Sequence, residues 1–245
     1  MSYGYEKRVS YSECDGVGVL RYDALVDIFQ DCSTFQSEDT DYTLAKMLGM
    51  HRGWMLSFWQ IDIAKMPSLG DNVYVGTFPY SMKGCIGSRN FFLKDADGDM
   101  LAKSNSIWVL MDLEKQQPVK IPDEMATCFE IGGKLDMEYL PRKLKIPDSE
   151  VIHTSRFTVE RFFLDSNGHM NNAWFVRLGE TSLQALRDTS DTAASGNISR
   201  ICVEYKKQAR LGDVLILDTY KAEDGIYINM RNESNISYAI YFCKV

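Results

Sequence analysis

The sequence has no long apolar run, no closely spaced cysteine pair and only three histidines. No stretch approaches the ~18 apolar residues that a membrane-spanning helix needs. The N-terminal segment, residues 1–16, lacks the apolar core of a secretory signal, so we expect a cytoplasmic protein. The six cysteines show no metal-like spacing, which favours free thiols. We therefore predict no metal site and no cofactor.

An excess of positive charge is also missing. The chain carries 27 Lys and Arg against 34 Asp and Glu, a net charge of −7. This balance argues against general affinity for nucleic acid or anionic membranes, although an acidic partner can still bind a local basic patch. With 245 residues, 45% of them hydrophobic, the chain is long enough for one large domain or two of ordinary size.

Two segments of the chain resemble each other: FWQIDIAKMPSLGDNVYVGT, residues 58–77, and RICVEYKKQARLGDVLILDT, residues 200–219. Both contain Leu-Gly-Asp, followed by alternating aliphatic residues and a threonine. The separation is constant, since Asp71 to Asp213 and the two threonines both span 142 positions. Leu-Gly-Asp favours a tight turn, and the period-two alternation beside it favours strands. The matching turn and strands indicate an internal repeat.

A helical pattern precedes each repeated segment. The apolar residues at helical spacing are Leu25, Ile28, Phe29, Cys32 and Phe35 in the first half and Phe175, Val176, Leu183 and Leu186 in the second. Gly49 is a plausible end of the first helix, and Gly179 would let the second helix approach a sheet closely. Further strands follow, with hairpin turns expected at Asp95–Asp99 and near Asn232–Asn235.

Each half is therefore predicted to consist of a strand, a helix and several antiparallel strands. This is an α+β unit, in which one long helix packs on a curved sheet. Glycines and prolines between the halves indicate a linker. We predict a first domain over residues 1–130, a linker over 131–149 and a second domain over 150–245.

Of the three histidines, only His169 has an unusual polar neighbourhood. His51 and His153 are better explained as structural or surface residues. The segment FLDSNGHMNNAWF surrounds His169 with one aspartate and three asparagines: Asp165, Asn167, Asn171 and Asn172. Gly168 makes this turn flexible.

Two interpretations account for this polar turn. Asn171 or Asn172 can simply cap the following helix, because Asn and Asp favour caps and turns. A cap, however, gives no role to a histidine flanked by donors and acceptors, which favours a catalytic or binding turn at the helix start. The corresponding segment of the first half, residues 13–25, has neither histidine nor asparagine. The active site should then belong mainly to the second half, which leaves the first free to hold an apolar substrate.

At these residues the sequence resembles the acyl-acyl carrier protein (acyl-ACP) thioesterases. LDSNGHMNNAWF matches the Asp-x-Asn-x-His-x-Asn-Asn motif of that family, and the first half carries similar segments, among them VDIFQDCSTFQSE and WMLSFWQIDI. The resemblance runs over essentially the whole chain. It implies two tandem hotdog domains, with the acyl chain held in the first. It also implies hydrolysis of the thioester between a fatty acyl chain and acyl carrier protein (ACP).

The resemblance implies catalytic roles for Asp165, Asn167 and His169, which occupy the motif positions. The family's next catalytic residue is a strand glutamate. Here Gln208 takes its place, with Glu204 as a reserve carboxylate at the same strand parity. Because a glutamine cannot accept a proton as a carboxylate would, the role of base falls to His169. Asp165 would orient His169 or polarise the water, and Asn167 would position the carbonyl or the water.

Water attack is favoured over an acyl-enzyme, because Ala209 stands where some members of the family have a cysteine. A thiolate is a good leaving group that needs little acid assistance. The main demands are therefore a positioned water, a base and donors to the developing oxyanion. We expect the backbone N–H groups near Gly168 and His169 to be those donors.

Substrate and partner contacts are predicted at three places. Gly168 and Asn171 would bind the substrate at the turn. Trp54, Phe58 and Trp59 would line the acyl pocket, although such residues are more often plain core. Because ACP is acidic, a basic patch should receive it. The candidates are Lys206, Lys207 and Arg210, with a second cluster at Arg142, Lys143 and Lys145, unless these are only solvated surface charges.

Other functions remain open at this point. An acyl-CoA thioesterase would use the same fold and the same water chemistry. A non-catalytic acyl-binding protein would fit the glutamine at position 208. A hotdog dehydratase is disfavoured, because the asparagine-rich turn has no obvious role in removing a β-hydroxyl group. A homodimer is compatible with each of these functions.

Overall fold

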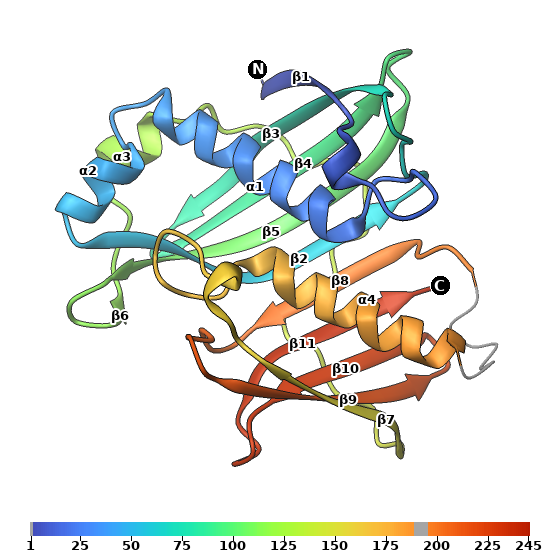
Figure 1. Ribbon diagram of the computed structural model, residues 1–245. Helices are drawn as coiled ribbons and strands as arrows, with labels where there is room; N and C mark the ends of the chain where they lie inside the picture. The colour runs from blue at the N-terminus through green and yellow to red at the C-terminus, as the bar shows by residue number, and fades with distance from the viewer. Residues whose placement is uncertain (1, 189–195) are drawn as a thin grey trace. The chain divides into compact units, whose positions relative to one another are not determined.

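The computed structural model describes residues 2–188 and 196–245. The chain forms two compact units. The first comprises Met1–Ser57 and Ile61–Leu140, and the second comprises Phe58–Gln60 and Pro141–Val245. We call them the first unit and the second unit, and Figure 1 shows that each contains one long helix and a sheet.

The first unit is a five-stranded sheet with a long helix on it. Its strands run in the order β1-β3-β4-β5-β2, and the two-residue strand β6 pairs with β5. The elements are β1 (Tyr3–Arg8), η1 (Tyr11–Glu13), α1 (Tyr22–Glu38), α2 (Leu44–Gly49), β2 (Arg52–Ile63), β3 (Asn72–Lys83), β4 (Ile86–Asp95), β5 (Met100–Asp112), β6 (Gln117–Pro118) and α3 (Asp123–Thr127).

The second unit repeats this plan. Its elements are β7 (Val151–Thr158), η2 (Arg161–Phe163), α4 (Asn172–Asp188), β8 (Arg200–Tyr205), β9 (Val214–Ala222), β10 (Gly225–Arg231) and β11 (Ser237–Lys244). Its strands run in the order β7-β9-β10-β11-β8, which is the first unit's order element for element. The predicted duplication is thus confirmed, and the chain is two tandem hotdog domains of the α+β class.

The long helices form where the apolar spacing predicted them. The inward face of α1 is buried at Leu25, Ile28, Phe29 and Cys32, whereas Phe35 stays 45% exposed. Phe29 stacks on Phe91 of β4 with the ring centroids 5.3 Å apart. The first helix is not continuous to Gly49, however, because α1 ends at Glu38 and the separate helix α2 ends at Gly49.

In the second unit the space between the long helix and the sheet is filled by a sheet residue, Tyr241 of β11, and the facing helix residue is a glycine. A Cβ at Gly179 of α4 would lie 2.8 Å from the ring of Tyr241 on β11. The absence of a side chain therefore lets the helix come down onto that ring. The close approach predicted for Gly179 is confirmed.

The predicted turns are also present. Asp71 Oδ2 accepts the backbone N–H of Ser68 at 2.8 Å, and Asp213 Oδ2 accepts that of Arg210 at 2.9 Å. Asp95 and Asn232 close the two hairpins, since each side chain accepts a backbone N–H four residues onward. The carboxylate of Asp95 is thus engaged by its own turn.

The predicted linker divides between the units. Residues up to Leu140 belong to the first unit, and the second resumes at Pro141. The first part of the segment covers the first unit's sheet, because Asn90 Oδ1 accepts the backbone N–H of Leu135 and the hydroxyl of Tyr139.

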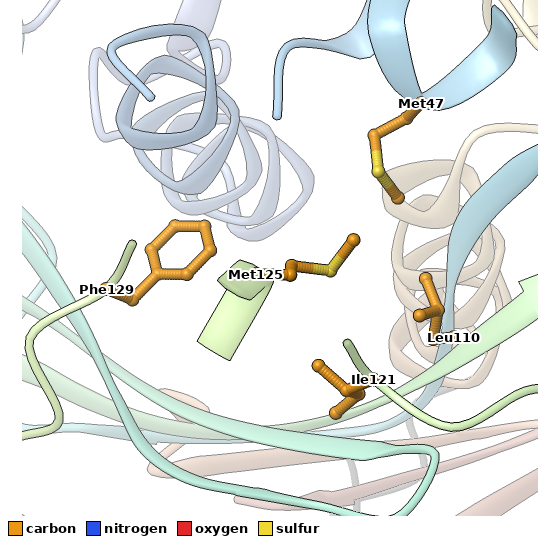
Figure 2. Packing of buried hydrophobic residues seen from close by; sticks show 5 residues of the cluster. All are labelled: Met47, Leu110, Ile121, Met125 and Phe129. Carbon is orange, nitrogen blue, oxygen red and sulfur yellow. The ribbon is translucent and has the colours of Figure 1, made fainter. Parts of the chain in front are cut away.

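A separate small core lies between α2, α3 and the first unit's sheet. Its buried members, which we call the methionine cluster, are Met47, Leu110, Ile121, Met125 and Phe129. Figure 2 shows Met125 between Phe129 on one side and Met47 and Leu110 on the other. Trp54 and Met82 pack against the cluster as partly buried residues.

The sequence led to expectations about membrane spans, cysteines and metal sites, which the described residues can be compared with. No helix in the described ranges is long and apolar enough to cross a membrane. The six cysteines are all free, with Cys32, Cys202 and Cys243 buried. Among the residues that the structure describes, no group of three or more His, Cys, Asp or Glu side chains could hold a metal ion.

Candidate active site

Hydrogen bonds to Asp165 close the turn that carries His169. This turn lies just before α4. Asp165 Oδ1 accepts the backbone N–H groups of Asn167 at 2.8 Å and His169 at 3.3 Å. In the backbone, Asp165 N–H donates to the carbonyl of His169 at 2.8 Å, and Gly168 N–H donates to the carbonyl of Asp165 at 3.0 Å. Gly168 has φ +73°, a conformation that favours glycine.

The first unit contains the same turn 150 positions earlier, from Asp15 to Val19. Asp15 Oδ1 accepts the backbone N–H groups of Val17 at 3.0 Å and Val19 at 2.9 Å. Gly18 N–H donates to the Asp15 carbonyl, and Asp15 N–H to the Val19 carbonyl. The carboxylate at this position therefore builds the turn in both units, and only the second turn carries a histidine.

This bonding corrects one expectation about the oxyanion. The N–H groups of Gly168 and His169 both donate to Asp165 within the turn. The prediction that they are oxyanion donors is therefore wrong for this structure. Gly168 itself is exposed, and its contribution is the shape of the turn rather than a free donor.

Asn171 acts as the cap that one interpretation predicted. Its Oδ1 accepts the backbone N–H of Ala173 at 2.9 Å, in the first turn of α4. The counterpart in the first unit is Arg21, which donates to Asp23 at 3.0 Å and to the carbonyls of Ser12 and Cys14. An ion pair thus occupies in the first unit the place where the second unit has a small amide.

The environment of His169 favours a neutral imidazole. Burial lowers the pKa of His169, the positive charge of Arg210 lowers it further, and Asp165 partly offsets both. Nδ1 is enclosed and has no hydrogen-bond partner among the described residues. No hydrogen bond joins the imidazole to Asp165, so orientation of the ring by that carboxylate is not observed here.

Gln208 lies beside this turn, but not on a strand. Met170 N–H donates to the carbonyl of Ala209 at 2.9 Å, which brings the residue next to Gln208 against the residue next to His169. Strand β8 ends at Tyr205. Beyond it, Lys206 and Lys207 both donate their N–H groups to one carbonyl, that of Tyr238, as in a β-bulge.

The bulge corrects the parity argument for Glu204. An extra residue shifts the alternation of side chains, so Glu204 and Gln208 do not share a strand face. Glu204 Oε2 accepts the backbone N–H of Leu144 at 2.9 Å and lies 3.7 Å from the Lys206 ammonium. Its carboxylate is thus held by the segment that enters the second unit, which disfavours its reserve role.

Two polar groups of the turn remain available to a substrate or a water. The side chain of Asn167 is exposed and forms no hydrogen bond with the described part of the chain. Asp165 uses Oδ1 for its turn, and no described residue contacts Oδ2 with a hydrogen bond. A neutral imidazole, a carboxylate oxygen and an amide within five consecutive residues can activate and position a water.

The residues predicted to bind ACP are exposed. Lys206, Lys207 and Arg210 all lie on the surface around the loop that carries Gln208. Lys207 Nζ sits 4.6 Å from the centroid of the Tyr238 ring and donates to its hydroxyl at 3.3 Å. Lys143 and Lys145 are also exposed, whereas Arg142 is partly buried.

The predicted acyl-pocket residues differ in exposure. Phe58 and Trp59 are 0% and 1% exposed, as expected of core side chains. Trp54 is partly exposed and packs against the methionine cluster, so it is the one of the three whose surface a ligand can reach directly.

Sequence reasoning missed two features. The shared role of Asp15 and Asp165 was hidden because the repeat was matched at a separation of 142, whereas the turns are separated by 150. The extra helix α2 of the first unit lies between α1 and β2 and changes the separation. The second missed residue is Arg89, a buried arginine on β4, for which the local sequence gives no signal.

The fold and the polar turn define a double-hotdog protein with its candidate site in the second unit. Models of known protein families match both units. Residues 2–129 match the model of the acyl-ACP thioesterase N-terminal domain, and residues 147–239 match that of the acyl-ACP thioesterase C-terminal domain. The chain therefore belongs to the acyl-ACP thioesterase family.

Individual relatives are distant in sequence. The chain is 25% identical over 194 residues to a chloroplastic oleoyl-ACP thioesterase of Arabidopsis thaliana, which covers 73% of this chain and 51% of the relative. It is 29% identical over 179 residues to a chloroplastic acyl-[acyl-carrier-protein] hydrolase of Cuphea viscosissima, covering 70% and 41%. The chain thus spans about half the length, or less, of these relatives.

Solved structures share the whole fold. An acyl-ACP thioesterase from Bacteroides thetaiotaomicron superposes with a TM-score of 0.84 at 19% identity, covering 98% of this chain and 96% of that chain. A 12:0-ACP thioesterase from Umbellularia californica gives 0.82 at 19% identity, covering 99% and 96%. At this identity the likeness establishes the architecture alone.

Proposed function

We propose that the protein hydrolyses fatty acyl-ACP thioesters to free fatty acid and holo-ACP. The observation that carries this proposal is the His169 turn. Its half-buried imidazole has a lowered pKa, and the matching turn of the first unit has Val19 at the same position with the same hydrogen bond. Membership of the acyl-ACP thioesterase family supports the choice of substrate.

The proposed reaction is a direct attack by water. His169 accepts one proton as the water oxygen bonds to the thioester carbonyl carbon. The tetrahedral intermediate then collapses, the carbon–sulfur bond breaks, and the proton returns from the imidazolium to the leaving thiolate. Asp165 Oδ2 holds the water and steadies the imidazolium charge, while the Asn167 amide donates to the carbonyl oxygen. Gln208 contributes hydrogen bonds but takes no proton.

The deciding experiment is a hydrolysis panel over acyl-ACP substrates of increasing chain length. Wild-type protein should release free thiol and fatty acid, with a preference for some chain lengths. The His169→Ala variant should lose most of this activity while remaining folded. Bound fatty acid without turnover by the wild type would instead identify a non-catalytic acyl-binding protein.

The partner is a separate part of the proposal. We propose that Lys206, Lys207 and Arg210 receive the acidic surface of ACP, because all three are exposed around the loop that carries Gln208. Reversal of charge in Lys206→Glu with Lys207→Glu should raise KM for acyl-ACP much more than for acyl-CoA. The matched control is Lys120→Glu in the first unit, where Lys120 pairs with Asp123 on the surface. Equal losses with both substrates would contradict ACP docking at this patch.

A further inference from the structure

An aromatic cluster reaches the surface of the second unit beside the His169 turn. It consists of Phe157, Phe162, Phe163 and Trp174. Phe163 is buried, and its ring centroid lies 4.9 Å from that of Phe157 and 4.1 Å from those of Phe162 and Trp174. Phe162 is 68% exposed, and Trp174 is partly exposed. Because Phe162 continues into the cluster, it is not a single scattered apolar residue of the surface.

The first unit shows that the fold does not need these rings. At a separation of 150 positions, the counterparts in the first unit are charged, polar or small, and in the same order they are Lys7, Ser12, Glu13 and Ala24. Lys7 and Glu13 form an ion pair at 2.7 Å where the second unit packs two rings. The exposed aromatic surface is therefore a property of the second unit, which also carries the histidine.

Positive charge borders the aromatic cluster. Arg177 lies one turn after Trp174 on α4, and its Cζ is 4.9 Å from the centroid of the indole ring. Arg161 lies on η2, and both arginines are exposed. Glu160, which is also exposed, offsets one of these charges. The counterpart of Arg177 in the first unit is Asp27, so the sign of the charge at this position differs between the units.

The aromatic cluster and the basic patch proposed to receive ACP flank the His169 turn on opposite sides. Asn171 N–H donates to the carbonyl of Phe163 at 2.9 Å, and the preceding N–H, that of Met170, donates to the carbonyl of Ala209 at 2.9 Å. Successive N–H groups of an extended segment point in opposite directions. The turn therefore runs between the cluster and the loop that carries the basic patch, and a partner that spans the turn would contact both.

We propose that the aromatic cluster is the apolar anchor of the surface that docks ACP. Phe162 contacts an apolar side chain of ACP, and Arg161 and Arg177 face its carboxylates. A few aromatic and arginine residues supply most of the affinity of a protein–protein interface, and charges at the rim steer the partner. This docking surface rests on the proposed function, since it serves the same partner, and it adds a contact of a different chemical kind to the basic patch.

Two other occupants match the cluster less well. The rings of Phe162, Phe163 and Trp174 meet at angles of 58° to 72°, so these three do not form the parallel walls that sandwich a nucleobase. The net charge of −7 disfavours an anionic membrane. An acidic protein with an exposed apolar side chain matches both the rings and the arginines.

The test measures the binding of holo-ACP without turnover. Isothermal titration calorimetry compares the wild type with Phe162→Ser, which introduces the side chain that the first unit has at the matching position. The Kd for holo-ACP should rise about tenfold or more. The melting temperature should be unchanged, because Phe162 is mostly exposed. Tyr11→Ser is the matched control and should bind as the wild type does, because Tyr11 is an aromatic residue of η1 that is 84% exposed.

Hydrolysis provides a second measurement. In Phe162→Ser, kcat/KM for acyl-ACP should fall by the same factor as the affinity, while kcat and the hydrolysis of a small thioester stay unchanged. Failure of the proposed function would be distinguishable from failure of this docking surface. A protein that binds holo-ACP through Phe162 but does not hydrolyse acyl-ACP would keep the docking surface and lose the proposed activity.

Several outcomes overturn the proposal. They are no binding of holo-ACP to the wild type, an unchanged Kd in Phe162→Ser, and an equal rise of Kd in Tyr11→Ser. CoA and phosphatidylcholine vesicles are titrated in parallel. A loss of affinity in Phe162→Ser for CoA or for the vesicles, with holo-ACP unaffected, would identify a nucleotide site or a membrane contact in place of ACP docking.

Discussion

The turn at Asp15 and the turn at Asp165 have the same backbone hydrogen bonds and different chemistry. In each, one carboxylate oxygen accepts two N–H groups, two and four residues onward. The side chains presented by the two turns differ completely. Val19 of the first turn corresponds to His169 of the second, and Val17 to Asn167.

This difference separates what the fold requires from what the site requires. The aspartate is needed wherever the turn is built, since it is present in the unit that has no histidine. The imidazole and the amide are present only in the second unit, and the first turn forms without them. Substitutions that make one turn resemble the other should therefore change activity without changing the fold.

The largest effect is expected for His169→Val, which gives the second turn the side chain of the first. Loss of the proposed base should lower kcat about 10²–10⁴-fold. The melting temperature should stay within a few degrees, because Val19 occupies the same backbone position in the first unit. Steady-state hydrolysis of acyl-ACP and circular dichroism measure the two quantities.

His153→Ala is the matched histidine control, because His153 lies on β7 and not on the turn. It should retain turnover. A His169→Val variant with near-normal kcat would show that the turn's histidine is not the base.

The second prediction separates the two functions of the turn aspartate. Asp165→Asn keeps an oxygen that can accept the N–H groups of Asn167 and His169, but it removes the negative charge. We expect kcat to fall about tenfold, the effect of one lost charge-assisted interaction, with little change in stability. Asp15→Ala should do the reverse: it removes two turn hydrogen bonds and should destabilise the protein by about 1–2 kcal/mol. Denaturant unfolding and steady-state kcat are measured for both variants. Equal loss of stability in Asp165→Asn and Asp15→Ala would contradict the proposed separation of the aspartate's charge from its role in the turn.

The sequence predicted the duplication and its elements well, because local chemistry determines them. The Leu-Gly-Asp turns, the apolar faces of both long helices and the Asp95 and Asn232 hairpins need only near neighbours. Prediction from the sequence was less successful where one extra residue alters the alternation of side chains along a strand. The bulge at Lys206 and Lys207 depends on a shared acceptor, Tyr238 O, more than thirty positions away in the chain, so no local pattern announces it.

The candidate site shows the same limit. The polar turn was visible as a cluster of side chains in the sequence, and Asn171 as its cap was among the interpretations. The engagement of the Gly168 and His169 amides was not visible, since it depends on which way the Asp165 carboxylate turns. The burial of Arg89 against Gln36 and Thr77 was equally hidden, because it depends on residues from α1, β3 and β4 together.

A smaller effect is expected for Gln208→Glu, which introduces the carboxylate that the sequence resemblance implies at this position of the second unit. If His169 is already the base, kcat should change by less than about tenfold in either direction. The position corresponds to Met66 in the first unit, where no ionisable group is present. Comparison of Gln208→Glu with Gln208→Met measures the contribution of the amide. An increase of a hundredfold or more in Gln208→Glu would show that the missing carboxylate limits the wild-type enzyme.

The smallest effect should be a shift of the pH profile in Arg210→Ala. The charge of Arg210 is one of the causes that lower the pKa of His169, after burial. Its removal should raise that pKa, so that the neutral imidazole is lost at a higher pH and the acid limb of kcat/KM moves upward. At pH 8 the activity should be unchanged. A small thioester substrate avoids any effect on ACP docking, and NMR titration of His169 gives the pKa directly. Lys206→Ala is the control, since its charge is not among the causes of the shift, and an identical acid limb in Arg210→Ala would place the origin of the lowered pKa in burial alone.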